Sequence, residues 1–247
     1  MVYDATLYKN KPDLSKYGIN PLNILYVARF YEKGEPSEQM PTRSRVKKIA
    51  QEAATKGDMV VIDIEHWPAK GDEAVVADSV RKYTQLAKWM HEFQPKLRIG
   101  FYALPPIQDY YRAISGQGSK EYSAWQKDND RLINIAEAVD ALFPSAYTFY
   151  ANRQDWKRYA IEQIREARRF GKPVYVFLWP QYHESNRLYG ETYLSPEYWG
   201  LELETAREYA DGVVIWGGWS KDGPAKWDDQ ASWWQETKAF MARLANQ

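Results

Sequence analysis

Cysteine is absent from this 247-residue sequence, so disulfides, thiolate catalysis and cysteine-ligated metals are excluded. Only three histidines occur, His66, His91 and His183, and this scarcity argues against a histidine-rich metal site. No apolar run approaches the roughly 18 residues of a membrane span, so we expect no membrane partner. No glycine-rich phosphate loop follows any predicted strand, which disfavours a nucleotide-dependent enzyme. We therefore expect neither a metal nor a cofactor.

The formal net charge is zero, because 33 Lys and Arg balance 33 Asp and Glu. A field that attracts nucleic acid or an anionic membrane is not expected from this balance. The N-terminus lacks the basic and then apolar pattern of a signal peptide. We therefore expect either a cytoplasmic protein or a secreted one whose leader has been removed.

Aromatic residues are abundant, with 11 Trp and 19 Tyr. Flat sugar faces stack well on such rings, and clefts that combine rings with a few polar groups make good ligand sites. The alternative is that many of these rings fill the core. We expect both to hold for different rings.

One stretch, residues 59–67 (MVVIDIEHW), organises the rest of the sequence. Its β-branched start is typical of a buried strand, and successive side chains of a strand point to opposite faces, so Asp63 and Glu65 share one face. Like charges placed together repel, which should keep one carboxyl protonated near neutral pH. Acid catalysis of glycoside cleavage needs such a group. The alternative is structural, with Asp63 capping the next loop and Glu65 paired with an arginine.

Strands and helices alternate along the whole chain without a linker or a change in composition. The predicted strands are residues 2–8, 22–30, 59–62, 97–102, 139–143, 174–178 and 212–216. The predicted helices are residues 45–55, 72–93, 119–138, 152–170, 196–209 and 229–246. Such alternation indicates an α/β fold with a parallel sheet covered by helices. We predict a single catalytic domain, residues 1–247, that forms a monomeric (β/α) TIM-like barrel of seven or eight parallel strands; a doubly wound sheet is the alternative.

Residues suited to chemistry follow the predicted strands, where such barrels place their active sites. The types suit glycoside hydrolysis, in which one acid protonates the leaving oxygen, a second acid orients a neighbouring group and tyrosine hydroxyls bind the sugar. The predicted catalytic residues are Asp63, Glu65 and Tyr147. The predicted substrate-binding residues are Tyr31, Trp67, Tyr102, Gln181, Tyr182, Trp216 and Trp219. For each ring the alternative is a place in the core.

Five segments, in order from about residue 24 to residue 220, resemble the hyaluronidases, the family 56 glycoside hydrolases. VVIDIEHW resembles their catalytic strand, in which D-x-E is followed by Trp. The other four are similar to an early strand with its tyrosine-containing loop, a G-F-Y-x-x-P stretch, an L-Y-P-S-x-Y stretch and a closing G-V-V-L-W. They read ILYVARFYEKGE, RIGFYALPP, ALFPSAY and DGVVIWGGW.

The resemblance implies a retaining, substrate-assisted hydrolase without a protein nucleophile, metal or cofactor. Glu65 would be the proton donor and then the general base, and Asp63 would hydrogen-bond the nitrogen of the substrate's 2-acetamido group. Tyr147 would bond the acetamido oxygen, and Trp216 would wall the pocket for the acetamido methyl. The substrate would be a polysaccharide or oligosaccharide.

The departures from the family narrow this expectation. Hyaluronidases are usually longer, secreted and disulfide-bonded, so a shorter chain without cysteine points to a microbial relative. Hyaluronan is a polyanion, and the strand ends offer few Arg or Lys, which favours a different polymer containing N-acetylhexosamine. The D-x-E and the final V-I-W also resemble family 18 chitinases, although Val61 stands where their motif has its second acid.

Three alternatives stay open. One is a chitinase-like enzyme, and the second is another retaining or inverting glycosidase, in which Glu65 would act with an acid on a different strand. The third is a carbohydrate-binding barrel without catalysis, since fold does not decide function. A binding protein has no need of an acid pair at a strand end.

Overall fold

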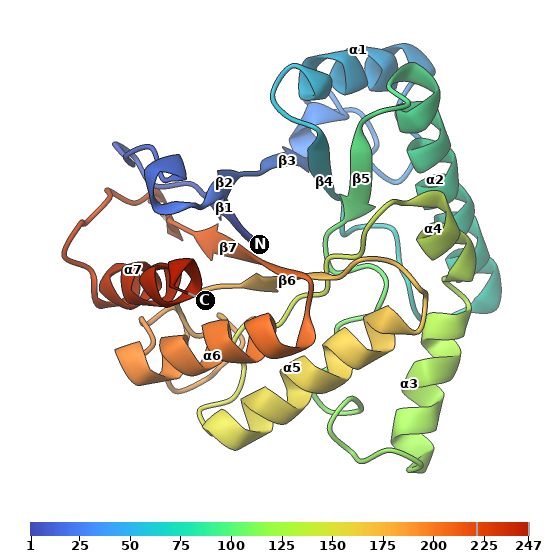
Figure 1. Ribbon diagram of the computed structural model, residues 1–247. Coiled ribbons are helices and arrows are strands. Elements are labelled where there is room, and N and C mark those ends of the chain that lie inside the picture. The colour runs from blue at the N-terminus through green and yellow to red at the C-terminus, as the bar shows by residue number, and fades with distance from the viewer. Residues whose placement is uncertain (221, 247) are drawn as a thin grey trace. The chain divides into compact units, whose positions relative to one another are not determined.

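The computed structural model describes residues 1–220 and 222–246, and its contacts divide the chain into two compact units. The central unit comprises Leu22–Pro144 and Glu166–Val174. The terminal unit comprises Met1–Pro21, Ser145–Arg165 and the chain from Tyr175 onward. In both units parallel strands alternate with helices along the chain (Figure 1), which confirms the predicted α/β class.

The central unit holds three parallel strands in the order β3-β4-β5. They are β3 (Asn23–Tyr26), β4 (Met59–Asp63) and β5 (Arg98–Phe101). The middle strand, β4, is buried from Met59 to Ile62, as its β-branched run predicts. Because β4 has a partner on each side, Asp63 lies at the carboxyl end of the middle strand of this sheet, directly opposite Tyr26 of β3.

Helices follow each of these strands, and three of the four begin at a side chain that caps them. They are α1 (Arg43–Ala54), α2 (Glu73–Phe93), α3 (Lys120–Asp130) and α4 (Ile133–Ala138). Thr42, Asp72 and Ser119 accept backbone N–H bonds at the starts of α1, α2 and α3. Such caps satisfy N–H groups that have no partner within the helix, which is why the helices start there.

The terminal unit has a four-stranded parallel sheet in the order β2-β1-β7-β6. Its strands are β1 (Val2–Thr6), β2 (Asn20–Pro21), β6 (Tyr175–Leu178) and β7 (Gly212–Gly217). Two short strands, β8 (Trp219–Ser220) and β9 (Gly223–Pro224), form an antiparallel pair. The helices α6 (Pro196–Tyr209) and α7 (Ser232–Ala245) lie in this unit, while α5 (Arg153–Arg168) begins in it and ends in the central unit. The early strand predicted at residues 2–8 is therefore present, although it ends at Thr6.

Three predicted elements are wrong in their extent. The strand predicted at residues 22–30 ends at Tyr26, and one 3₁₀ turn (Val27–Arg29) follows it. The helix predicted at residues 119–138 is two helices, because Asn129 of α3 turns its side chain to the backbone of residue 107 and the chain then bends before α4. Residues 139–143 form only isolated parallel bridges, as expected where Pro144 has no N–H to extend a ladder.

No helix in residues 1–220 or 222–246 is long and apolar enough to cross a membrane.

Gly100 shows how tightly β5 packs in the central unit. A Cβ at this position would lie 2.4 Å from the carbonyl oxygen of Ala141 and 2.4 Å from the Phe143 ring. We therefore expect Gly100→Ala to lower the free energy of unfolding by about 1–3 kcal/mol, because the core would be overpacked. Urea denaturation measures this change. Gly57→Ala is the matched control, since nothing lies within 4 Å of a Cβ placed at that position. An equal loss of unfolding free energy in both variants would contradict the packing argument.

Candidate active site

The predicted acid pair lies at the carboxyl end of β4. Burial alternates along this segment: Ile62 and Ile64 are buried, Asp63 is half-buried and Glu65 is exposed. This alternation agrees with a shared face for Asp63 and Glu65, and it leaves Glu65 accessible to a ligand.

The charge of Glu65 influences the ionisation of Asp63. Burial and, as the smaller cause, the negative charge of Glu65 together raise the pKa of Asp63 to about 7. An ordinary aspartate has lost its proton several pH units lower. Below about pH 7 the pair therefore retains a proton.

A tyrosine that the sequence did not single out fixes the chain around Glu65. The hydroxyl of Tyr83, from α2, donates to the carbonyl of Ile64 at 2.6 Å and lies 3.3 Å from the carbonyl of Trp67. Burial raises the pKa of Tyr83, and the charges of Glu65 and Asp63 raise it further, so this hydroxyl stays protonated and lies close to both acids. Tyr83 belongs to the apolar stripe of α2, so no sequence pattern distinguishes it from a core residue.

Glu65 lines a cleft of about 500 Å³ within the central unit. Trp67, Tyr102, Lys70 and Gln108 are among its other lining residues. The structure therefore brings the predicted residues Glu65, Trp67 and Tyr102 together. Trp67 is only 2% exposed, and its ring N–H donates to the Ser37 carbonyl at 3.0 Å, so this ring also belongs to the core.

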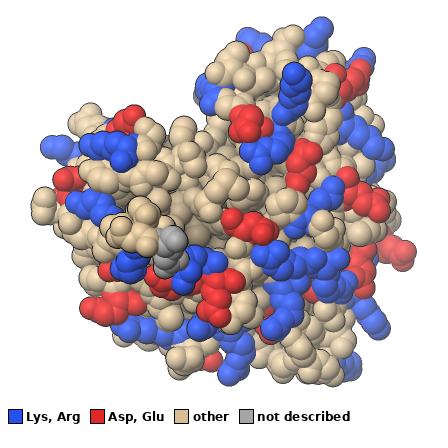
Figure 2. All heavy atoms as spheres, in the orientation of Figure 1, with Lys and Arg blue, Asp and Glu red and all other residues tan. Residues whose placement is uncertain are grey.

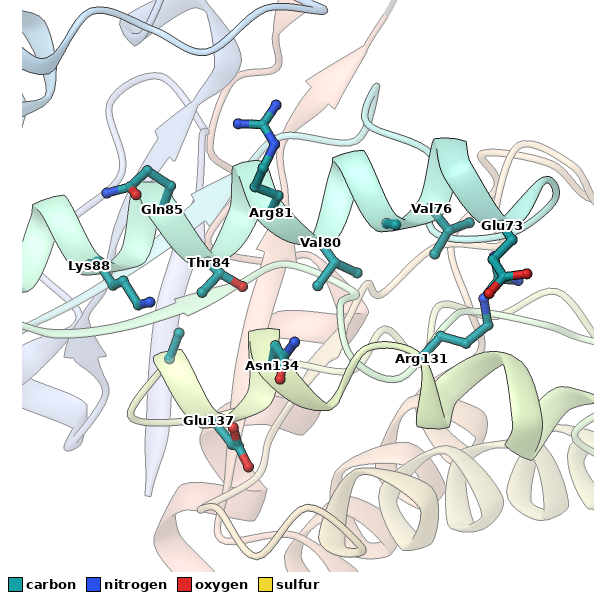
Figure 3. Close-up of a pocket in the computed structure, with 12 residues that line it drawn as sticks. Glu73, Val76, Val80, Arg81, Thr84, Gln85, Lys88, Arg131, Asn134 and Glu137 are labelled. Atoms are coloured by element: carbon teal, nitrogen blue, oxygen red, sulfur yellow. The ribbon is translucent and has the colours of Figure 1, made fainter.

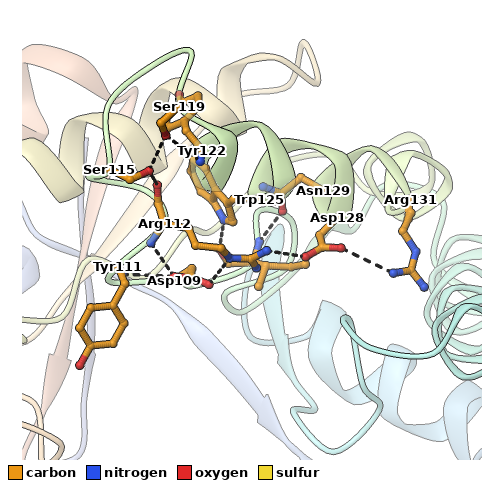
Figure 4. A network of polar contacts seen from close by, with 11 residues as sticks. Asp109, Tyr111, Arg112, Ser115, Ser119, Tyr122, Trp125, Asp128, Asn129 and Arg131 are labelled. Atoms are coloured by element: carbon orange, nitrogen blue, oxygen red, sulfur yellow. Dashed lines mark hydrogen bonds and ion pairs between the residues drawn. The ribbon is translucent and has the colours of Figure 1, made fainter.

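The loop after β5 forms one wall of this cleft and is anchored to α3 (Figure 4). Arg112 bridges Asp109 at 2.7 Å and Asp128 at 2.8 Å. Trp125 and Asn129 of α3 bond the carbonyl and the N–H of Ile107 at 2.9 and 2.8 Å. The wall that carries Gln108 is thus held by both ion pairs and buried hydrogen bonds, which argues for a cleft that exists before the ligand arrives.

A second cavity of the central unit, about 760 Å³, lies between α2 and α4 (Figure 3). It is lined by Arg81, Lys88, Arg131, Glu73 and Glu137 among others, with apolar side chains between them. Four of these charges lie in α2 and α4, Arg131 is the C-cap residue of α3, and both signs are present. The cavity contains none of the predicted site residues, so we place the candidate active site at the cleft of Glu65.

Tyr31, a predicted binding residue, is not among the residues that line the cleft. Its hydroxyl donates to the Gln39 carbonyl at 2.7 Å, and its ring contacts His66 at 6.0 Å between centroids. His66 in turn bonds the Ser37 carbonyl. Both rings therefore hold the long loop after β3 against the segment that follows β4.

The terminal unit gathers a second set of predicted residues at the carboxyl ends of its strands. Tyr147 stacks on Trp216 with 5.7 Å between ring centroids and 27° between planes. Trp179, the residue after β6, packs edge-on against both rings at 5.6 and 5.1 Å. Trp179 was not predicted as a site residue. It directly follows β6, and Trp216 similarly lies near the end of β7. Position at a strand end was the signal that could have found it.

Gln181 supports this cluster of rings. Its side-chain oxygen accepts the N–H of Trp179 at 2.9 Å, and its amide donates to the Glu191 carbonyl at 2.5 Å. Tyr182 packs its ring against Tyr189 at 5.2 Å. Trp219, in β8, is 52% exposed. Of the predicted residues in this unit, Tyr147, Gln181 and Trp216 therefore join one cluster, whereas Tyr182 packs against Tyr189 and Trp219 is exposed.

Glu202 of α6 is a fully buried acid beneath the segment that carries Tyr147. It accepts the hydroxyl of Thr148 at 2.5 Å, and its second oxygen is buried without a hydrogen-bond partner. Burial raises the pKa of Glu202 well above its usual range, so this carboxyl is held in its neutral form.

Among the residues that the structure describes, no three His, Asp or Glu side chains are grouped so that they could hold a metal ion.

Comparison with solved structures identifies the fold. Bee venom hyaluronidase, in a monoclinic crystal form, superposes with a TM-score of 0.66 at 17% identity, over 100% of this chain and 97% of that chain. The bee venom enzyme in complex with a hyaluronic acid tetramer gives 0.65 at 17% identity, over 100% and 96%. The chain folds as a (β/α) barrel of the TIM type.

The predicted barrel fold is thereby confirmed, and the parallel strands with helices after them are its repeating units. No model of a protein family matches the sequence, and a search of curated proteins also found no match. In barrels of this type the carboxyl ends of the strands carry the active site. The acid pair of β4 and the ring cluster after β6 and β7 both occupy such strand ends.

Proposed function

We propose that this protein is a glycoside hydrolase that cleaves polysaccharides containing N-acetylhexosamine by a retaining, substrate-assisted mechanism. The observation that carries the proposal is the acid pair: a half-buried Asp63 with its pKa raised to about 7, beside an exposed Glu65 that lines a cleft. The fold shared with bee venom hyaluronidase supports it, because that enzyme has been solved in complex with a hyaluronic acid tetramer.

In this mechanism the proton that the acid pair retains is on Glu65 when the bond to the leaving sugar breaks, and Glu65 donates it to the glycosidic oxygen. The carbonyl oxygen of the substrate's own 2-acetamido group attacks the anomeric carbon, so no protein nucleophile is needed. Asp63 accepts a hydrogen bond from the acetamido N–H and stabilises the positive charge that develops there. Water then opens the cyclic intermediate, with Glu65 now acting as the general base.

The rings of the terminal unit supply the remaining roles in the proposal. Tyr147 donates a hydrogen bond to the acetamido oxygen and holds it in the direction of attack. Trp216 packs against the acetamido methyl, and its contacts with Tyr147 and Trp179 fix the orientation of its ring. Preorganised groups of this kind are what stabilise a transition state at low cost.

Charge favours an uncharged substrate over hyaluronan. Lys70 is the single cationic side chain among the cleft residues that the structure describes. On the face shown in Figure 2, Lys and Arg are interspersed with Asp and Glu. A polyanion needs a basic groove for affinity and steering. We therefore propose a neutral polymer of N-acetylhexosamine as the substrate.

Mass spectrometry of products from hyaluronan, chondroitin, chitin and peptidoglycan fragments tests the function. The proposal expects new saccharides without unsaturation, formed from an acetylated polymer and not from its de-N-acetylated form. Cleavage of the de-N-acetylated polymer at an equal rate would refute substrate assistance. Tight binding without turnover would favour a carbohydrate-binding protein.

Tyr147→Phe tests the role of the hydroxyl. We expect kcat to fall by roughly 10²-fold, the usual cost of losing one donor to the reacting oxygen. Because the ring remains, the stack on Trp216 and the melting temperature should change little. Tyr3→Phe is the control, since Tyr3 is another buried tyrosine of the terminal unit and packs against Tyr175. Full activity in Tyr147→Phe would remove this residue from the mechanism.

A further inference from the structure

Two of the exposed rings of the terminal unit lie in segments that follow the strands of its buried ring cluster. Tyr193 is 48% exposed and Trp219 is 52% exposed, although large apolar surfaces usually lie inside. Tyr193 comes from the loop after β6, and Trp219 comes from β8, just after β7. Both therefore follow the carboxyl ends of neighbouring parallel strands.

Tyr193 is held in place by its polar edge. Its hydroxyl lies 3.1 Å from the hydroxyl of Tyr8, which is buried. Its backbone forms an antiparallel bridge with Gln181, the residue that bonds Trp179. A ring whose hydroxyl and backbone are both fixed loses little freedom when a ligand stacks on it, which makes it a preorganised surface.

Tyr8 connects this ring to the chain next to Trp219. Gly218 has a φ of +81°, and a Cβ there would lie 2.7 Å from the ring and from the backbone nitrogen of Tyr8. Only glycine permits so close an approach in this conformation. Tyr193 and the segment of Trp219 therefore share Tyr8 as a neighbour, and Gln181 links the same surface to the buried cluster.

The charges of the loop indicate what the surface can bind. Residues 181–194 contain Glu184, Arg187 and Glu191, all exposed, so acids outnumber bases. Burial lowers the pKa of His183, which leaves this histidine neutral at pH 7. The net charge of this loop is negative and does not favour an anionic sugar, whereas exposed rings suit the apolar face of an uncharged pyranose.

We propose that Tyr193 and Trp219 form a stacking platform for uncharged sugar units beyond the one that reacts. This inference rests on the proposed function and narrows its substrate to long neutral glycans. The platform would make affinity depend on chain length, because a disaccharide bound at the reacting position has no further sugar units to stack on the rings.

The test measures binding by calorimetry in the Glu65→Gln background, with the disaccharide and the hexasaccharide of N-acetylglucosamine as probes. We expect Tyr193→Ala to weaken hexasaccharide binding roughly 5- to 10-fold and disaccharide binding less than about twofold. Tyr193→Phe, which keeps the ring, should stay within about threefold of the background. Tyr111→Ala, an exposed tyrosine of the central unit, is the matched control and should change neither affinity.

If Tyr193→Ala destabilises its loop, the affinities of Trp219→Ala for the two probes test the platform independently. The platform would be overturned by any of three results. They are an equal loss of affinity for the disaccharide and the hexasaccharide, no loss of affinity in either variant, and no binding of the hexasaccharide to the Glu65→Gln protein. These outcomes leave the proposed hydrolysis untouched, since that is measured as turnover by the wild type. Turnover that survives Glu65→Gln would overturn the hydrolase and leave the binding result standing.

Discussion

Glu65→Gln should abolish hydrolysis while leaving the fold and the binding of substrate intact. The amide has the size of the acid but cannot donate the proton that the leaving oxygen needs, so we expect kcat to fall by about 10³-fold. Because Glu65 is exposed at the strand end, its replacement should not disturb the core. Rates on the substrate found by the product screen and calorimetric binding measure the two effects separately.

The same variant makes a prediction that needs no substrate. The charge of Glu65 is one of the two causes that raise the pKa of Asp63, and the other is burial. Glu65→Gln should therefore lower the pKa of Asp63 below about 7 without restoring its usual value, which carboxyl ¹³C NMR can follow. Glu121→Gln, an exposed acid in the first turn of α3, is the control. An unchanged Asp63 titration would show that the two carboxyls do not interact.

The sequence predicted the parts of the site that depend on local order. Alternation along β4 is enough to place Asp63 and Glu65 on one face, and a buried run followed by two acids has few structural explanations. The strand–helix order predicted the barrel class for a similar reason, because parallel strands need helical connections. Each of these inferences uses only neighbours in the sequence.

What the sequence could not predict depends on contacts between distant segments. Tyr83 reaches the Ile64 carbonyl from 19 residues away, and nothing in α2 distinguishes it from its apolar neighbours. The anchoring of the loop after β5 depends on Arg112 and Asp128, whose pairing follows from how the loop folds back on α3. Tyr31 was predicted from its place after a strand, yet its hydroxyl bonds the backbone of its own loop.

Asp63→Asn should make the protein more stable at alkaline pH and much less active. The folded-state pKa of Asp63 is about 7, above the unfolded value near 3.9. Between these values the folded state holds a proton that the unfolded state has lost, so stability falls as pH rises from about 4 to about 7. The full cost, on the order of 2–4 kcal/mol, is present above pH 7. An asparagine at this position carries no charge, so the variant does not bear this cost of burying a carboxylate.

Urea denaturation across this pH range checks the prediction, and the expected result is a flatter stability curve that exceeds the wild type at high pH. Asp58→Asn is the matched control, because Asp58 is an exposed partner of Arg98 at the start of β4 and should leave the pH dependence unchanged. Parallel curves for Asp63→Asn and wild type would refute a buried, coupled carboxyl. A stability gain together with a roughly 10²-fold loss of kcat would mean that the protein retains an unfavourable charge because catalysis requires it.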